Sequence, residues 1–307
     1  RNISFEIFHG EIFGLVGESG SGKSTVVQAM MRILPPPAYI SRGKVFINHE
    51  DIMEASKYDI VGFRWKKISI VMQSALNALN PVLSVREQIH DVLYTHKGLK
   101  GKEADDRAKE LLSLVDINFD RLDSHPHQLS GGMKQRIVIA IALAIMPPII
   151  IMDEPTTALD VIVEREIIAK IIELRKELGI TILFITHDLN LLMEFADRLA
   201  IMKNGEIVEL DKIEDIQKGG KHPYTKKLIG SIPSASGKRQ KGLLSRPDSL
   251  NLSKSPILEV HNLEKVFQSP GIFNKNKIIA VDNVSFKVFK GEIVALVGES
   301  GSGKSTI

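Results

Sequence analysis

The stretch GESGSGKST occupies residues 17–25 and recurs unchanged at residues 298–306. Its spacing, Gly-x-x-x-x-Gly-Lys-Ser, is the pattern of a phosphate-binding loop, in which glycines let successive backbone N–H groups turn towards phosphate oxygens. The apolar run EIFGLVG precedes the first copy, and STVVQAMMRIL, apolar at helical spacing, follows it. Such flanks predict a strand before the loop and a helix after it, whose dipole would point its positive end at the anion. The simpler alternative, a Gly/Ser-rich turn without a ligand, does not account for these flanks.

Two side chains of the first copy are predicted to take specific roles. Lys23 would reach the β and γ phosphates of a nucleotide, and Ser24 would offer its hydroxyl to Mg²⁺. The predicted nucleotide-binding residues of the first copy are Gly17, Glu18, Ser19, Gly20, Ser21, Gly22, Lys23, Ser24 and Thr25. Those of the second copy are Gly298, Gly301, Gly303, Lys304, Ser305 and Thr306.

The two loops end a longer internal repeat. Residues 4–25 and 285–306 are identical at seventeen of twenty-two positions, with a constant offset of 281. A repeat of this size predicts two domains of one kind. We expect the chain to be truncated at both ends, because the second copy has a run-up that the first copy lacks. The predicted domains are residues 1–232, which lack their N-terminal strand, a Ser-, Lys- and Pro-rich linker at 233–256, and the start of a second domain at 257–307.

Composition argues against several classes of function. The 307 residues carry a formal net charge of +3, without the basic excess that nucleic-acid binding uses, so no nucleic-acid partner is expected. With no cysteine, these residues can form neither a disulfide nor a cysteine-ligated metal site. The most apolar run, residues 137–152, is too short for a membrane span and is broken by Pro147 and Pro148.

Short apolar runs alternate with amphipathic segments along the rest of the first domain. This order predicts an α/β fold with a mostly parallel, doubly wound sheet flanked by helices. An Asn204–Gly205 turn signal predicts an antiparallel hairpin at residues 199–210. Residues 74–147 are predicted to be largely helical. The predicted strands include residues 67–73, 149–154 and 180–188.

Polar residues follow three of these predicted strands. Asp153 and Glu154 end one, His187 ends the next, and Gln73 ends an earlier one. Ligands bind at the carboxyl ends of strands in open parallel sheets, so we expect these residues to be catalytic. Asp153 suits the shell of the Mg²⁺ that Ser24 holds, Glu154 suits polarising the attacking water, and His187 suits a hydrogen bond to the γ phosphate. Gln73 could contact Mg²⁺ or the water.

The stretch LSGGMKQR at residues 129–136 predicts a second anion-binding helix start, without a loop lysine. One domain rarely needs two such sites for one nucleotide. This stretch is therefore expected to serve a nucleotide that another domain holds. Its predicted contact residues are Leu129, Ser130, Gly131, Gly132 and Gln135.

Together these motifs resemble the nucleotide-binding subunits of ABC transporters. The phosphate loop, Gln73, the LSGG signature, the acidic pair, TALD at residues 157–160 with Asp160, and His187 occur in the order of that family. ALNP at residues 78–81 and HPYTKKL at residues 222–228 resemble the oligopeptide and dipeptide importer branch, and the second copy resembles its partner ATPase. The chain thus resembles a tandem fusion of two such ATPases.

This resemblance implies a P-loop NTPase core with an antiparallel β subdomain and an α-helical signature subdomain. It implies an ATPase with ATP and Mg²⁺ as cofactors, peripheral on the cytoplasmic face of the membrane. Two domains would close head to tail on ATP, so that Ser130 faces Lys304 rather than Lys23. The implied partners are permease subunits, contacted near residues 74–128, the second domain, and indirectly an extracytoplasmic solute-binding protein. The resemblance implies uptake of oligopeptides, dipeptides or a related solute, with sugars or nickel as the alternatives that close relatives import.

Two features depart from the family pattern. The aromatic residue that stacks on adenine is missing from the first copy, and Phe267 is the candidate in the second. The cysteines that many members carry after HPYT are also missing. One alternative is a soluble tandem ATP-binding protein acting on ribosomes, whose linker would be long, charged and helical. Another is a chromosome- or repair-type ATPase, for which a long coiled coil would be expected.

Overall fold

The computed structural model of this chain describes residues 2–73, 78–157, 159–231, 255–268, 277–298 and 302–307. The chain divides into two compact units, Arg1–Ile232 and Pro233–Ile307, and each is described by itself. The predicted linker at 233–256 lies almost wholly outside the described residues, as do Ala158 of TALD and Gly301 of the second loop.

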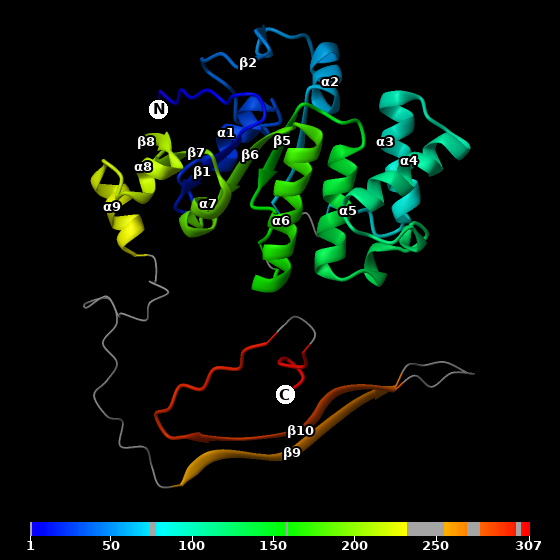
Figure 1. Ribbon diagram of the computed structural model, residues 1–307, viewed down its shortest axis with the longest axis vertical. Helices are drawn as coiled ribbons and strands as arrows, with labels where there is room; N and C mark the ends of the chain where they lie inside the picture. The colour runs from blue at the N-terminus through cyan, green and yellow to red at the C-terminus, as the bar shows by residue number, and fades with distance from the viewer. Residues whose placement is uncertain (1, 74–77, 158, 232–254, 269–276, 299–301) are drawn as a thin grey trace. The chain divides into compact units, whose positions relative to one another are not determined.

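A six-stranded sheet forms the centre of the first unit, in the order β4-β5-β6-β1-β7-β8 (Figure 1). Neighbouring strands are parallel except β7 and β8, which form the antiparallel hairpin predicted around Asn204 and Gly205. The sheet is therefore the mostly parallel one that the sequence predicted. The strands are β1 Ile12–Gly17, β4 Ile68–Val71, β5 Ile149–Asp153, β6 Thr181–Thr186, β7 Arg198–Lys203 and β8 Glu206–Lys212, and a separate small hairpin pairs β2 Phe46–Ile47 with β3 Glu50–Asp51.

Alternate residues of the central strands enter two different hydrophobic clusters. In β1, Ile12 and Val16 join one cluster and Phe13 and Leu15 join the other. Because side chains of a strand alternate between its faces, each face of the sheet has its own core. The first cluster contains residues of α5, α6 and α7, and the second contains residues of α1 and α2. These helices are α1 Lys23–Met30, α2 Lys57–Lys66, α5 Gly131–Leu143, α6 Val161–Leu178 and α7 Leu189–Phe195.

Two further helices, α3 Val85–Lys97 and α4 Gly101–Leu114, pack on each other and on α5 beyond the edge of the sheet (Figure 1). Ser84 starts α3 with a capping box, since its hydroxyl accepts from Glu87 N and Glu87 bonds back to Ser84 N. The Arg86 guanidinium contacts Asp105 and Asp123, which ties α3 to α4 and to the segment after it. These helices lie within residues 74–147, for which the sequence predicts a helical subdomain. The remaining turns, and the helices after the hairpin, are η2 Phe119–Arg121, η3 Pro126–Gln128, α8 Ile213–Gln217 and α9 Pro223–Gly230.

The second unit contains an antiparallel pair, β9 Pro256–Gln268 with β10 Lys277–Phe289. The segment before the second loop, residues 292–298, forms no strand, and Ile293 is 96% exposed. In the first unit the equivalent strand β1 pairs with β6 and β7 on its two sides. Residues 292–298 lack such neighbours among the described residues.

No helix in the described ranges combines the length and the apolar character needed to cross a lipid bilayer.

Candidate functional site

The loop at residues 17–25 lies between the end of β1 and the start of α1, as predicted. Gly22 caps α1 with φ 102°, a left-handed conformation that side-chain-bearing residues rarely adopt. A Cβ at Gly17 would lie 2.3 Å from the Met202 carbonyl oxygen of β7, so only glycine fits there. Gly205 N, in the β7–β8 turn, donates to Ser21 O at 3.0 Å. The β7–β8 turn therefore holds the loop through this hydrogen bond.

Lys23 folds back onto the loop. Its Nζ donates to Gly17 O at 2.8 Å and to Glu18 O at 3.1 Å, and the residue is 5% exposed. Burial lowers the pKa of this ammonium, while the charges of Glu154 and Asp153 act in the opposite direction. A bound phosphate would offer the lysine a charged acceptor in place of two carbonyls, which is the stronger kind of hydrogen bond.

Ser24 and Asp153 meet across the site. The Ser24 hydroxyl donates to Asp153 Oδ1 at 3.2 Å, and Asp153 is 6% exposed at the end of β5. Burial raises the pKa of Asp153 and Glu154 adds to the effect, whereas the Ser24 hydrogen bond and Lys23 oppose it. A hydroxyl and a buried carboxyl are oxygen ligands of the kind Mg²⁺ prefers. They fit this ion, whose remaining ligands would be phosphate oxygens and water.

Three donors converge on the Glu154 carboxylate. Gln73 Nε2 donates to Oε2 at 3.0 Å, the Thr157 hydroxyl donates to the same oxygen at 3.1 Å, and His187 Nδ1 lies 3.2 Å from Oε1. The strands β4, β5 and β6 are neighbours in the sheet, so residues 73, 154 and 187, which follow their carboxyl ends, lie at the same end of the sheet. Glu154 itself has φ 47°, while its N–H still bonds to Ile185 O. A carboxylate held in this way can accept a proton from a water at a fixed position.

Two of these contacts are not evident from the motifs alone. Gln73, which the sequence predicts beside Mg²⁺ or the attacking water, donates its amide to Glu154 in this structure. Thr157 belongs to TALD, and its hydroxyl contacts the predicted base. The signal for Thr157 was its spacing: a hydroxyl three residues after a carboxylate can bond back across a turn. Thr157 N also donates to Glu154 O at 3.3 Å, which closes that turn.

The signature begins α5, as predicted, with the Ser130 hydroxyl accepting from Met133 N at 3.3 Å. A Cβ at Gly132 would lie 2.6 Å from a Val163 methyl group, so the signature packs closely on the start of α6. Gln135 is 2% exposed and Leu129 is 7% exposed. Within the described ranges, no hydrogen bond joins residues 129–135 to the loop or to Glu154.

The second loop, at residues 298–306, repeats one hydrogen bond that is found in the first loop. Lys304 Nζ donates to Gly298 O at 2.5 Å, as Lys23 does to Gly17, and to Ser302 Oγ at 3.3 Å. Gly303 has φ 88°, close to the value at Gly22.

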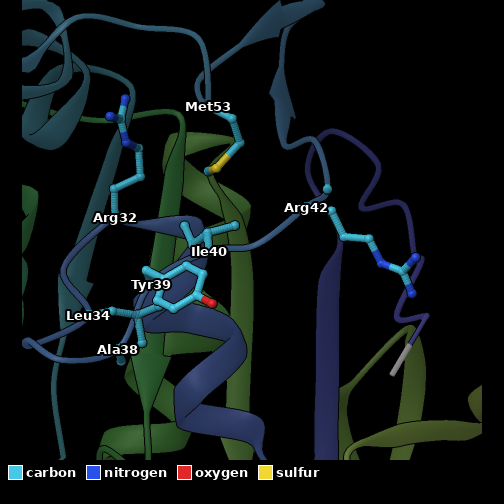
Figure 2. A pocket seen from close by; sticks show the side chains of 8 residues that line it. Arg32, Leu34, Ala38, Tyr39, Ile40, Arg42 and Met53 are labelled. Atoms are coloured by element: carbon cyan, nitrogen blue, oxygen red, sulfur yellow. The ribbon is translucent and has the colours of Figure 1, made fainter.

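A hollow of about 390 Å³ lies beyond α1 (Figure 2). Arg32 at its rim is held by the Ile52 and Ala55 carbonyls, and Tyr39 is 81% exposed. None of its lining belongs to the group around Lys23 and Glu154. The lining residues are Arg32, Leu34, Ala38, Tyr39, Ile40, Arg42, Gly43 and Met53.

Comparison with known proteins gives a consistent result. The family model described as "ABC transporter" matches residues 1–157 and 281–307. The chain is 39% identical to the Escherichia coli K12 "Uncharacterized ABC transporter ATP-binding protein YejF", and 38% identical to the "Glutathione import ATP-binding protein GsiA" of Salmonella typhimurium LT2. Both matches cover 100% of this chain but only 57% and 54% of the relative, so the chain spans about half the length of these relatives.

A third relative is shorter. The "Oligopeptide transport ATP-binding protein OppD" of Bacillus subtilis 168 is 40% identical over 80% of this chain and 70% of its own length. Among solved structures, the ATP-binding cassette MJ0796, dimeric and bound to ADP and Pi after hydrolysis, has a TM-score of 0.61 at 32% identity. That match covers 69% of this chain and 90% of the cassette.

Proposed function

This chain belongs to the ABC transporter family, and we propose that it is an ATP-hydrolysing subunit of an importer. The observation that carries this proposal is the arrangement around Glu154. A carboxylate fixed by three donors lies at the sheet edge beside the Ser24–Asp153 pair, and Lys23 contacts the same acidic pair electrostatically. A loop that binds phosphates and a positioned base are what ATP hydrolysis requires.

Each residue would have a role in ATP hydrolysis that follows from its position. The backbone N–H groups of residues 20–24 and the Lys23 ammonium would bind the β and γ phosphates. Ser24 and Asp153 would hold Mg²⁺, which neutralises charge on the phosphates when bound. Glu154 would orient a water in line with the γ phosphate and accept its proton, and His187 and Gln73 would fix the carboxylate and the water.

The named relatives support a peptide-type solute. One is described by glutathione import and another by oligopeptide transport. ALNP and HPYTKKL point to the same branch. We therefore propose uptake of oligopeptides, dipeptides or a related small solute. The import function in these names favours the importer over the ribosomal alternative.

The proposed partners follow from the same arrangement. Permease subunits would contact the helical subdomain, and an extracytoplasmic binding protein would deliver the solute to them. The chain would lie on the cytoplasmic face of the membrane. Within the chain, we propose parts of two cassettes in tandem, residues 1–232 and 257–307. The family match at residues 281–307 and the contact of Lys304 with Gly298 support this proposal.

Uptake by an assembled transporter that contains this chain tests the proposal as a whole. Proteoliposomes that hold this transporter with its permease and binding protein should accumulate a labelled tripeptide only when Mg·ATP is present at the cytoplasmic side. ATP hydrolysis without uptake of any peptide, sugar or nickel would contradict the importer assignment.

The signature gives a separate prediction. Ser130→Arg should leave ATP binding to residues 17–25 unchanged but lower hydrolysis by the assembled transporter roughly 100-fold, because a donor to the nucleotide of the other cassette is lost. Steady-state phosphate release measures this change. Ser41→Arg, at an exposed position, is the control. Equal rates for the Ser130→Arg variant and the wild type would contradict a site in which the signature of one cassette contacts the nucleotide of the other.

Thr157 gives another prediction. Thr157→Val should lower the rate of hydrolysis about fivefold without changing the KM for ATP, because one hydrogen bond that positions Glu154 is lost. Thr157→Ser keeps the hydroxyl and should restore the rate. A Thr157→Val enzyme with the wild-type rate would show that this contact does not position the base.

A further inference from the structure

The turn that follows Glu154 contains a hydrogen bond that the proposed mechanism does not use. Thr156, two residues after the predicted base, donates from its hydroxyl to Glu164 Oε1 at 2.5 Å. Thr156 is 7% exposed, so its hydroxyl depends on this acceptor in place of water. A bond of this length from a hydroxyl to a carboxylate is of the stronger kind. It joins the segment after β5 to the first turn of α6.

The backbone of Glu154 needs such a support. Its φ is 47°, in the left-handed region that residues with side chains rarely adopt, and a position before a proline, here Pro155, favours extended backbone. A conformation of this kind persists only where neighbouring contacts hold it. On one side, Glu154 N donates to Ile185 O of β6 at 2.9 Å. On the other side, Pro155 has no N–H to donate, so Thr156 is the first residue that can anchor the chain through a donor.

The acceptor, Glu164, lies on a fixed part of the fold. Its N–H donates to Asp160 O at 2.9 Å, and the Asp160 side chain caps α6 by accepting from Val163 N at 3.0 Å. Val163 also packs on the signature, since a Cβ at Gly132 would lie 2.6 Å from its methyl group. Because a cap and α5 both fix the first turn of α6, the Glu164 carboxylate can hold Thr156 at a constant position.

The position of the Glu154 carboxylate depends on the same turn. Thr157, which directly follows Thr156, donates from its hydroxyl to Glu154 Oε2 at 3.1 Å and from its N–H to Glu154 O at 3.3 Å. A shift of Thr156 would therefore move both the backbone of Glu154 and one donor to its carboxylate. A general base must lie within hydrogen-bond reach of its water, and a displacement of about 1 Å can lower a rate about 100-fold.

We propose that Glu164 is a positioning residue for ATP hydrolysis: by accepting from Thr156, it holds the left-handed backbone from which the Glu154 carboxylate reaches the attacking water. This inference rests on the proposed function, ATP hydrolysis with Glu154 as the base. It goes further by giving a role to a carboxylate on α6 that acts through Thr156 rather than on the nucleotide.

Glu164→Ala, which removes the acceptor, tests the proposal in an assembled transporter that contains this chain. The readout is the Glu154-dependent rate of phosphate release, which is the rate of each protein minus that of the same protein with Glu154→Gln. It should fall about tenfold, the effect of one hydrogen bond to a charged group, without a change in the KM for ATP. Glu164→Gln keeps an acceptor oxygen and should recover most of the rate. Glu177→Ala, the same change at an exposed position of α6, should have the wild-type rate.

A double-mutant cycle tests whether Glu164 acts through Thr156. Thr156→Val should lower the Glu154-dependent rate as much as Glu164→Ala does, and Thr156→Ser should recover it. The double variant Thr156→Val/Glu164→Ala should be no slower than either single variant, because the same bond is lost in all three.

Three results would overturn the proposal. They are a wild-type rate for Glu164→Ala, a rise in the KM for ATP equal to the fall in rate, and full additivity of Thr156→Val with Glu164→Ala. Each of them leaves the proposed function standing. If Glu154→Gln alone hydrolyses ATP at the wild-type rate, the proposed function fails together with this inference, which distinguishes the two cases.

Discussion

Glu154→Gln should leave ATP binding intact and lower the rate of hydrolysis by at least about 100-fold, the usual contribution of a general base. Glutamine keeps the shape of the side chain and can still bond to Gln73 and Thr157, so the site should stay assembled. It cannot accept a proton from the attacking water. Phosphate release measured on the assembled transporter, together with the Kd for Mg·ATP, separates the two effects.

The control for this variant is Glu177→Gln, which removes the same charge from an exposed position near the end of α6. It should hydrolyse ATP at the wild-type rate. Full turnover by Glu154→Gln would instead remove Glu154 from the mechanism.

Lys23→Ala should weaken ATP binding to the first loop by more than about tenfold, or roughly 1.4 kcal/mol. The ammonium is the charged group of the loop nearest the predicted β and γ phosphates, and its loss also leaves the Gly17 and Glu18 carbonyls without their donor. Calorimetry on the Lys304→Ala background reports the first loop alone.

Lys176→Ala is the matched control, since that lysine lies exposed on α6. Its Kd should equal that of the parent. An unchanged Kd for Lys23→Ala would mean that the nucleotide binds elsewhere.

The sequence was sufficient to predict those parts of the site that depend on chain order. A strand, a glycine loop and a helix in succession are typical of a phosphate loop, and the carboxyl ends of parallel strands share one end of the sheet. Asp153, Glu154 and His187 lie at that end, with Ser24 on Asp153, and their roles in the reaction stay predictions.

The rest depends on side-chain directions and on neighbours, which spacing does not determine. The amide of Gln73 could have faced the metal site, and only the packed structure shows it on Glu154. Residues 292–298 repeat the apolar letters that precede the first loop, but among the described residues no strand pairs with them.

The position of Lys23 Nζ in a crystal structure of the Glu154→Gln variant with Mg·ATP tests the central claim most directly. We predict that the β and γ phosphates lie in the loop at residues 17–25. Lys23 Nζ should have left Gly17 O and Glu18 O, now at 2.8 and 3.1 Å, for a phosphate oxygen. A nucleotide bound away from this loop, with Lys23 still on the two carbonyls, would contradict it.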